Sequence, residues 1–552
     1  MGEPSGVERK GQMIRTLARW AAGAAAVELG VSLFALIAGG FRIQAGPLRI
    51  AARSWRPAFT QAVILGLIAA WLFRRDAALR GEYDVPVRVA RNVLARTVAT
   101  LKARPLWFGV FAGVAAAAWV CARLIDHSLV VGSTAGGWEY PFVRPFGPDV
   151  TAIVAAVTAL ACASLLWQPE GRSARSEWIA VCVCVSAAIG LQALLISLAP
   201  FSAGEIFRSD GPNSFYSVTQ QYGAAQVLGN FLQLRDRWPL HAHSNMPGKL
   251  LVLFALERFS NDPAVLAWLV VAVSNIGGIF LYVFVRDLFA DRRVAWFSLV
   301  LYLFVPGKLY FAPLMNIVTP AVAFGVAVLI LRWLRTGRLV FAAAAGASVY
   351  GLVLFEPLPL VLGVLFSILA VRAVYGGDLT WRRFIAQSGA LVLAFLATHA
   401  IVRLWFGFDL FVAFRHVALD AAAFNEQAGR PYGVWVRQNL LDFLLSCGVC
   451  QAVLFWIALG DGLRNWRRAD LPMARTAVLV CAGLAAIVLA LDLAGINRGE
   501  VVRLWIFLAC LFQIPAAYVC ARLNSRAALA LVLAMTVLQA ALGIKMIGFV
   551  LL

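Results

Sequence analysis

SAGEIFRSDGPNSFYSVTQQYG (202–223) and WPLHAHSNMPGKLLVLFALERFSND (238–262) lie in the longest polar interval of the chain, which runs from Phe201 to Asp262. Apolar runs of about 20 residues, the length that crosses a bilayer as a helix, bound this interval on both sides. Few other positions in so apolar a chain suit chemistry in water. The interval is therefore predicted to be the active-site loop of a membrane enzyme.

The composition excludes an ordinary soluble protein. Hydrophobic residues make up 62% of the 552 residues, charged residues 14%, and the mean hydropathy is +0.81. Apolar segments of spanning length number about fifteen and leave no room for a soluble domain. This predicts an all-α, polytopic bundle of transmembrane helices. The predicted spans are 19–41, 58–73, 106–125, 150–168, 178–200, 263–285, 294–306, 317–334, 339–355, 358–375, 384–404, 436–459, 476–494, 503–522 and 527–549.

Membrane topology explains the net charge of +20 better than nucleic acid does, so no nucleic-acid partner is expected. With the N-terminus in the cytoplasm, the inside connections hold most of the 48 Lys and Arg residues, including RNWRR at 464–468. The positive-inside rule requires this distribution. We therefore expect a multi-pass protein of the plasma (inner) membrane, with the loop 201–262 outside the cytoplasm and in contact with membrane lipids.

The spans divide the chain into parts. Residues 1–177 are predicted to form an N-terminal membrane extension with about four spans, and 178–522 to form the transmembrane core that carries the site. LLVLFALERF (250–259), inside the extracytoplasmic loop, is too short to cross and is predicted to be an interfacial helix. Residues 523–552 hold a C-terminal span.

Polar residues in four further segments are expected on the same face as this loop. One of these segments repeats the tripeptide PGK of 247–249, and another places Glu500 and Arg503 one helical turn apart. Their convergence on one face is the strongest functional signal in the sequence. The segments are 305–316, the turn at Glu356, 405–435 and 497–505.

The chemistry of this face suits a lipid-linked phosphate. The chain contains no GxxxxGK[ST] loop, no GxSxG and no HExxH. It does contain carboxylates on a loop, with Arg, Lys and His residues near the bilayer surface. Cations at headgroup depth hold a phosphate, while a carboxylate activates a hydroxyl. All nine cysteines fall in predicted spans, so no disulfide framework is expected.

Three short motifs resemble the GT-C superfamily of polytopic glycosyltransferases, which use polyprenyl-phosphate sugars. HSNMPGK (243–249) resembles the turn before the family's interfacial helix, with Met246 in place of a proline. FAPLMN (311–316) is similar to a short family connection, and NRGEVVRLW (497–505) resembles an acidic-x-x-Arg-x-Trp stretch of bacterial, notably actinobacterial, members. The resemblance covers roughly 178–522. It implies inverting transfer of a sugar from a polyprenyl-phosphate donor to a glycan or glycolipid acceptor of the cell envelope.

Residue roles follow from this resemblance. Asp210 is the predicted general base, with Glu205 as its rival, and both are therefore candidate catalytic residues. No ligand cluster predicts a metal site, although a divalent cation near Asp210 is allowed. The candidates for binding the donor phosphate and lipid are His243, Lys249, Arg208, Arg503, Arg498, Lys308 and Arg415. The candidates for binding substrate are Asn245, Tyr216, Asn316, Glu500 and His416.

Two other classes of protein remain open at this point. An O-antigen ligase or polymerase would share the outer lipid-phosphate chemistry, using Arg and His with less reliance on an acidic base. A lipid or glycan transporter should concentrate polar residues at mid-bilayer, on broken helices and in two related halves. The sequence shows few intramembrane charges and no half-repeat.

Overall fold

The computed structural model describes residues 105–147, 173–468 and 471–552, together with short stretches between 13 and 65 and between 149 and 157. The chain forms two compact units. The smaller unit includes an antiparallel pair of strands, β1 (Phe41–Ala45) and β2 (Leu48–Ala52). The predicted spans 19–41, 58–73 and 150–168 fall largely outside the described residues.

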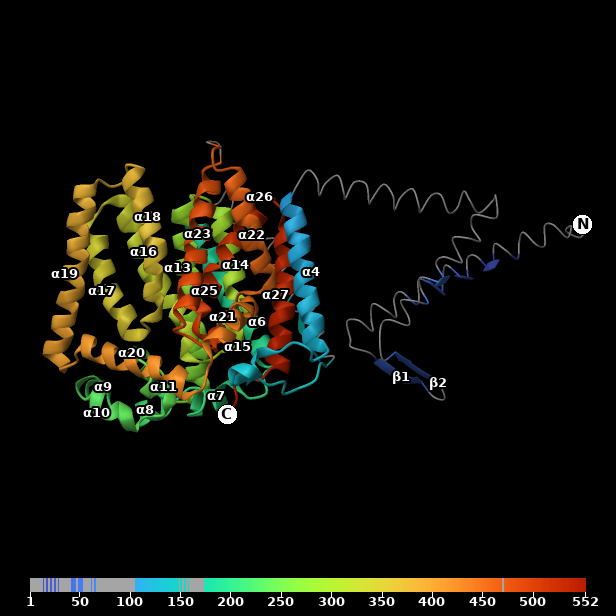
Figure 1. The fold of residues 1–552 in the computed structure, drawn as a ribbon, viewed down its shortest axis with the longest axis horizontal. Helices are drawn as coiled ribbons and strands as arrows, with labels where there is room; N and C mark the ends of the chain where they lie inside the picture. The colour runs from blue at the N-terminus through green and yellow to red at the C-terminus, as the bar shows by residue number, and fades with distance from the viewer. Residues whose placement is uncertain are drawn as a thin grey trace, which may run out of the picture. The chain divides into compact units, whose positions relative to one another are not determined.

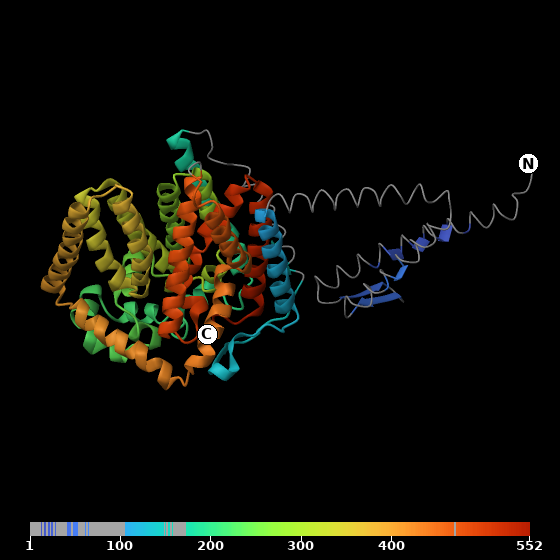
Figure 2. The same cartoon turned by 45° about the horizontal axis from the view of Figure 1, so that its top comes forward.

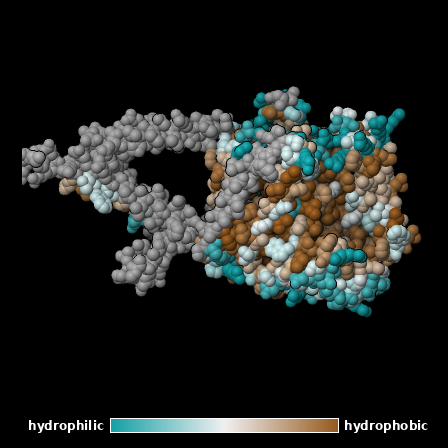
Figure 3. Space-filling model, turned by 180° about the vertical axis from the view of Figure 1, so that it is seen from behind, coloured by the Kyte–Doolittle hydropathy of each residue, from teal (hydrophilic) through white to brown (hydrophobic). Residues whose placement is uncertain are grey.

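The larger unit is a bundle of α-helices (Figure 1). Within the described residues, eight helices are long and apolar enough to cross a membrane, or nine if a sharply bent pair counts as one span. Figure 3 shows a hydrophobic band between hydrophilic ends, as a protein embedded in a bilayer requires. The eight are α4 (Pro105–Ile125), α6 (Ala174–Ile196), α13 (Pro263–Phe289), η3 with α16 (Met315–Thr336), η4 with α18 (Leu358–Tyr375), α19 (Trp381–Phe406), α23 (Pro472–Ala494) and α27 (Arg526–Met546).

Local sequence explains where the helices begin and end. Asp262 caps α13 by accepting hydrogen bonds from the N–H groups of Ala264 and Val265, and Pro263 occupies the first turn, where its missing N–H costs nothing. The helix ends at Ala290, which has the left-handed conformation (φ 53°) that terminates many helices.

Two predicted spans, 294–306 and 503–522, differ from the helices found, whereas 339–355 coincides with an apolar helix that is shorter than the eight. The segment 294–306 is α14 (Arg292–Leu303), whose 12 residues fall short of a bilayer crossing. The segment 339–355 is the 17-residue helix α17 (Leu339–Phe355). The segment 503–522 is divided among three short helices. These are α24 (Val501–Leu504), α25 (Ile506–Leu511) and α26 (Gln513–Arg522).

The predicted span 436–459 is broken at Gly448. Helices α21 (Tyr432–Cys447) and α22 (Val449–Arg464) meet there at 99°. Gln539 of α27 accepts the Val449 N–H at 3.0 Å and donates to the Leu445 carbonyl at 2.9 Å. Because free backbone groups are costly in a bilayer, this glutamine makes the break tolerable.

One end of the bundle, the upper end in Figure 1, is where α16, α18, α22 and α26 end, and we call it the arginine end after the arginines in these helix ends and in the connections beside them. Glu177 of α6 is buried there and joins three helices. It accepts hydrogen bonds from Tyr282 and Arg286 of α13 and pairs with Arg292 of α14. The arginines of this end are Arg175, Arg286, Arg292, Arg293, Arg332, Arg335, Arg338, Arg372, Arg382, Arg383, Arg464, Arg467, Arg468, Arg475, Arg522 and Arg526.

Short helices from the segment 201–262 cover the opposite end, which we call the loop end (Figure 2). The interfacial helix predicted at 250–259 corresponds to α12 (Gly248–Glu257), which buries Leu250 and Leu253. It packs on α8, α13 and α17. The other helices of the segment are α7 (Ala203–Arg208), α8 (Phe215–Gln221), α9 (Ala224–Gly229), α10 (Phe231–Leu234), η2 (Arg235–Arg237) and α11 (Leu240–His243).

Two more elements complete the loop end. Helix α20 (Leu410–Gln427) lies across it (Figure 1). A hairpin of β3 (Val131–Ser133) and β4 (Trp138–Tyr140), joined by the 3₁₀ turn η1 (Thr134–Gly136), packs on α21. The Trp435 Nε1–H donates to the Gly136 carbonyl at 3.0 Å. Part of the segment predicted as an N-terminal extension therefore packs with the core.

Candidate functional site

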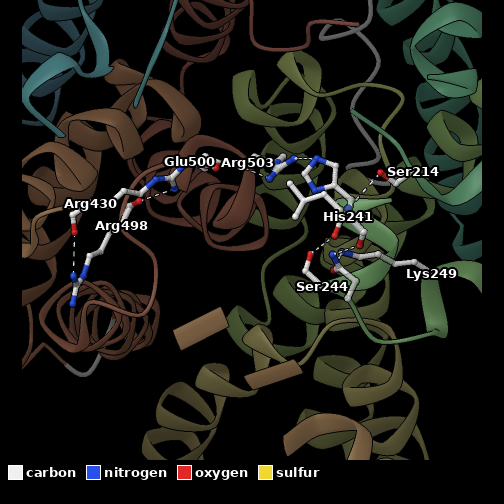
Figure 4. A network of polar contacts seen from close by, with 10 residues as sticks. Ser214, His241, Ser244, Lys249, Arg430, Arg498, Glu500 and Arg503 are labelled. Atoms are coloured by element: carbon white, nitrogen blue, oxygen red, sulfur yellow. Dashed lines mark hydrogen bonds and ion pairs between the residues drawn. The ribbon is translucent and has the colours of Figure 1, made fainter. Parts of the chain in front are cut away.

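Three arginines and one glutamate form a cluster at the loop end (Figure 4), which we call the cation cluster. Glu500 accepts a hydrogen bond from Arg430 at 2.8 Å and one from Arg503 at 2.5 Å. Arg498 and Arg430 each donate to the other's main-chain carbonyl, at 3.0 and 2.8 Å. Three guanidinium groups against one carboxylate leave two positive charges in excess among these four side chains.

The loop that carries this cluster has an unusual backbone. Gly499 (φ 88°) and Glu500 (φ 59°) are both left-handed. A side chain at position 499 would collide with the ring of Trp435. The main-chain N–H of Gly499 donates to Asn439 Oδ1 at 3.1 Å. Glycine is therefore required at 499, whereas a left-handed glutamate at 500 is strained. Such strain collects at functional sites.

His241 of α11 connects the loop helices to the cation cluster. Its Nε2 lies 3.2 Å from a terminal nitrogen of Arg503. Burial, with Arg503 and Lys249 nearby, lowers the pKa of His241 to about 3. The imidazole is therefore neutral at physiological pH, and its Nε2 accepts the hydrogen bond that Arg503 donates.

Asp210 lies one step further out, at the solvent. Its carboxylate is exposed and accepts a hydrogen bond from the Ser217 hydroxyl. The Ser214 hydroxyl donates to the Asp210 carbonyl at 2.5 Å and accepts the His241 N–H at 3.3 Å. Ser214 is itself left-handed (φ 58°). Ser214 thus joins Asp210 to His241, and through His241 to Arg503.

Lys249 is close to this network but is already paired. Its Nζ is buried and donates to Asn245 Oδ1 at 2.6 Å and to Glu356 Oε2 at 2.5 Å. Asn245 in turn donates to the His241 carbonyl at 2.8 Å. Lys249 and Asn245 therefore hold the loop helices against the turn after α17, and the lysine has a protein counterion rather than an open face.

His243 belongs to a second group of contacts. Its Nδ1 lies 3.0 Å from the Arg235 carbonyl, and its Nε2 lies 3.7 Å from Asp420 of α20. Arg235 is buried, pairs with Asp420 and donates to the His243 carbonyl at 3.2 Å. These contacts fix α20 to the loop helices.

Glu205 has a clear local role. It forms a capping box with Ser202, in which Glu205 Oε2 accepts the Ser202 N–H at 2.8 Å. The Tyr216 hydroxyl donates to the Asn261 carbonyl at 3.0 Å. Arg208 is exposed and forms no hydrogen bond or ion pair with the described residues.

Four other candidates lie outside the cation cluster. Lys308, in α15 (Pro306–Tyr310), is buried in the bundle, where its Nζ donates to Asn275 Oδ1 at 2.6 Å. Asn316 lies in η3 (Met315–Val318) and is partly buried. Arg415 and His416 are exposed on α20. The structure therefore brings together Arg498, Glu500, Arg503, Lys249 and Asn245, with Asp210 beside them.

The sequence did not single out several members of the network as site residues. They are His241, Ser214 and Arg430, and the bonds that define them join positions far apart in the chain. His241 and Arg503, for example, are 262 positions apart. The one local signal was the HAH pattern of 241–243, in which either histidine could face the site.

Two N–H groups of the cation cluster have no acceptor. The Nε atoms of Arg498 and Arg503 are buried without a hydrogen-bond partner within the described residues. A buried donor left unpaired costs about 1–3 kcal/mol, so these groups call for an acceptor from outside the chain. Among the described residues, no three His, Cys, Asp or Glu side chains are placed to hold a metal ion.

A search against known protein families finds no match for this chain, and a search among curated proteins finds none either. The geometry of the loop end therefore carries the functional argument.

Proposed function

We propose that this chain is an integral-membrane glycosyltransferase. It transfers a sugar from a polyprenyl-phosphate donor to a glycan or glycolipid acceptor of the cell envelope, with inversion at the anomeric carbon. The proposal combines the membrane-embedded bundle with the loop-end chemistry, and the GT-C resemblance of three short motifs supports it.

The cation cluster is the observation that carries this proposal. It combines two excess positive charges, two buried N–H donors that find no acceptor among the described residues, and backbone strain at Glu500. A phosphate supplies both the negative charge and the acceptor oxygens that such a cluster lacks. Because the cluster lies at one end of the bundle, a phosphate on a membrane lipid could reach it at headgroup depth.

The roles of the residues follow from charge development during transfer. Asp210 takes the proton of the acceptor hydroxyl as that oxygen attacks the anomeric carbon. The bond from this carbon to the phosphate oxygen breaks, and its electron pair leaves with the polyprenyl phosphate. Arg503 and Arg498 stabilise that anion. Asp210 then releases its proton to water, since its carboxylate is exposed.

The arginine end suggests the orientation. Under the positive-inside rule this end faces the cytoplasm. The loop end, with the cation cluster, then faces the extracytoplasmic side of the plasma membrane, where lipid-linked sugars rather than nucleotide sugars serve as donors.

The two other classes each have one feature in their favour. The neutral His241 in contact with Arg503 would also suit a ligase that relies on Arg and His. The break at Gly448 is the kind of discontinuity found in transporters. However, Gln539 and Gln513 form hydrogen bonds with the backbone groups that this break frees. In addition, an open hollow of about 600 Å³ lies at the loop end rather than at mid-bilayer.

The test is transfer from a panel of radiolabelled polyprenyl-phosphate sugars by purified protein in lipid nanodiscs. Wild type is compared with Asp210→Asn, and with Asp236→Asn as the control for an exposed loop carboxylate. We expect product from wild type and the control, and about a 1,000-fold loss with Asp210→Asn. Undiminished activity in Asp210→Asn would favour the ligase mechanism. Wild-type protein that neither binds nor turns over any donor would refute the transferase.

A further inference from the structure

An open hollow of about 600 Å³ lies at the loop end, next to Asp210 but separate from the cation cluster. Its volume falls in the range of small-molecule sites. Helix α7 with Ser209 after it, the first residues of α13, and Leu552 form its walls. The polar lining consists of Ser202, Glu205, Arg208, Ser209 and Asp262.

Close packing of two helices brings the two carboxylates of this hollow together. Gly204 of α7 lies against Ala264 of α13, where an added methyl would come within 3.1 Å of the alanine side chain. Ser202 and Glu205 form a capping box at the start of α7, and Asp262 caps α13, so the N–H groups of Ser202, Glu205, Ala264 and Val265 are already bonded. The two carboxylates each lie at the start of a helix and also line the hollow.

Each carboxylate uses only one oxygen in its cap. Glu205 bonds Ser202 through Oε2, and Asp262 bonds Ala264 and Val265 through Oδ1. The second oxygen of each forms no hydrogen bond or ion pair with the described residues. Two such oxygens, one unengaged guanidinium on Arg208 and the hydroxyl of Ser209 are complementary to neighbouring hydroxyl groups, which both donate and accept.

The position of the hollow gives this complementarity a purpose. Ser209 lines it, and Asp210 is the next residue in the chain. The main-chain carbonyl of Asp210 is joined through the Ser214 hydroxyl to the main chain of His241, whose ring contacts Arg503. The proposed base therefore directly follows a lining residue of the hollow in the chain, and its main chain is linked by hydrogen bonds to the cluster suited to phosphate.

We infer that this hollow is the acceptor subsite, and that it binds the hydroxyl groups of a sugar residue on the acceptor. The inference rests on the proposed function, because it gives an acceptor to the same transfer. It assigns Glu205 to binding acceptor hydroxyls rather than to proton transfer.

Isosteric variants separate binding from helix capping. Glu205→Gln keeps the S-x-x-Q form of the capping box, and Asp262→Asn keeps an N-cap residue of equal quality. Both remove the charge that faces the hollow. Arg208→Ala removes the guanidinium, and Arg258→Ala, an exposed arginine at the same end of the molecule, is its matched control.

The assay measures initial rates with the polyprenyl-phosphate sugar that wild type uses, and with the glycan and glycolipid extract of the native cell envelope as acceptor. We expect the acceptor KM to rise about 10-fold in Arg208→Ala and in the Glu205→Gln, Asp262→Asn double variant. The donor KM, and the slow transfer to water without acceptor, should stay at wild-type values, as should both constants of Arg258→Ala.

Three outcomes decide the matter. A raised acceptor KM with an unchanged donor KM supports the subsite. An unchanged acceptor KM in both hollow variants, with donor cleavage intact, overturns the subsite and leaves the transferase standing. Absence of donor cleavage in wild type itself, with or without acceptor, overturns the transferase, and the acceptor subsite falls with it.

Discussion

The bundle has an ion cluster at each end, and in each cluster one glutamate pairs with two arginines. At the arginine end, Glu177 is 2% exposed while its partners Arg286 and Arg292 are 27% and 49% exposed. At the loop end the glutamate and both arginines are largely buried, since Glu500 and Arg503 are each 14% exposed and Arg430 is 6% exposed. In the cluster around Glu177 the carboxylate is buried and the arginines are partly hydrated. In the cation cluster the arginines are shielded from water.

The difference extends to bonding and backbone. The two oxygens of Glu177 take three donors, and the residues of that cluster lie on regular helices. The cation cluster has an extra arginine, two N–H groups with no acceptor in the described part of the chain, and a strained backbone at Glu500. A saturated ion cluster on unstrained helices joins helices together. An unsaturated one on a strained loop is arranged for a ligand.

The strongest way to break this comparison is Arg503→Ala. We expect transfer to fall by about 100- to 1,000-fold, because the leaving phosphate loses a charged donor. The melting temperature should change little, since the same variant removes a buried excess charge. Arg503→Lys should recover part of the activity as a point charge. If Arg503→Ala loses much stability but transfers sugar as fast as wild type, the cation cluster only joins helices, as the cluster around Glu177 does.

The reciprocal change is Glu177→Gln at the arginine end. Losing two ion pairs to partly hydrated arginines should cost about 2 kcal/mol of unfolding free energy. Transfer per folded molecule should match wild type. Thermal unfolding and specific activity, measured on one preparation, check both expectations. A selective loss of transfer would contradict the structural role given to Glu177.

A smaller effect concerns acidification. The folded-state pKa of His241, about 3, is below its ordinary value of 6.5. The unfolded chain therefore binds more protons than the folded chain between these values, and wild type should lose stability as the pH falls from about 6.5 toward 3. His241→Gln should lose less over this range. The transfer rate of wild type should show no inflection from His241 near pH 6.5.

The smallest effect tests strain itself. Ala290, at the arginine end, is left-handed (φ 53°) like Glu500, but it is an exposed helix terminus. Ala290→Gly should raise the unfolding free energy by about 1 kcal/mol without changing transfer. Denaturant unfolding of the purified protein measures this. If Ala290→Gly is no more stable than wild type, a left-handed backbone is not strained in this protein, and backbone strain no longer distinguishes the site.

Hydropathy predicted the helical, membrane-embedded fold but not all of its segments. Apolar length identified α6, α13, α19, α23 and α27 close to their observed bounds. The same signal made 436–459 and 503–522 look continuous. Gln513 and Gln539 hold the first of these segments in its broken form. Contacts between distant helices do not show in a hydropathy pattern.

Spacing revealed parts of the site in a similar way. Glu500 and Arg503 are one turn apart and do pair, and Ser202 with Glu205 has the S-x-x-E spacing of a capping box. The PGK lysines look alike in sequence, yet Lys249 pairs with Glu356 while Lys308 lies deep in the bundle. Their separation depends on the tertiary fold.

The bonds made by Gln539 also bear on how the protein is made. Gln539 lies 90 residues after Val449, and 94 after Leu445, the two groups it caps at the break. During synthesis, α21 and α22 therefore leave the ribosome long before their cap exists. We expect α21 and α22 to lack a fixed arrangement at the translocon and to reach their 99° angle only when α27 has entered the membrane. Maturation of the cluster next to this break thus waits for one of the last segments to be inserted.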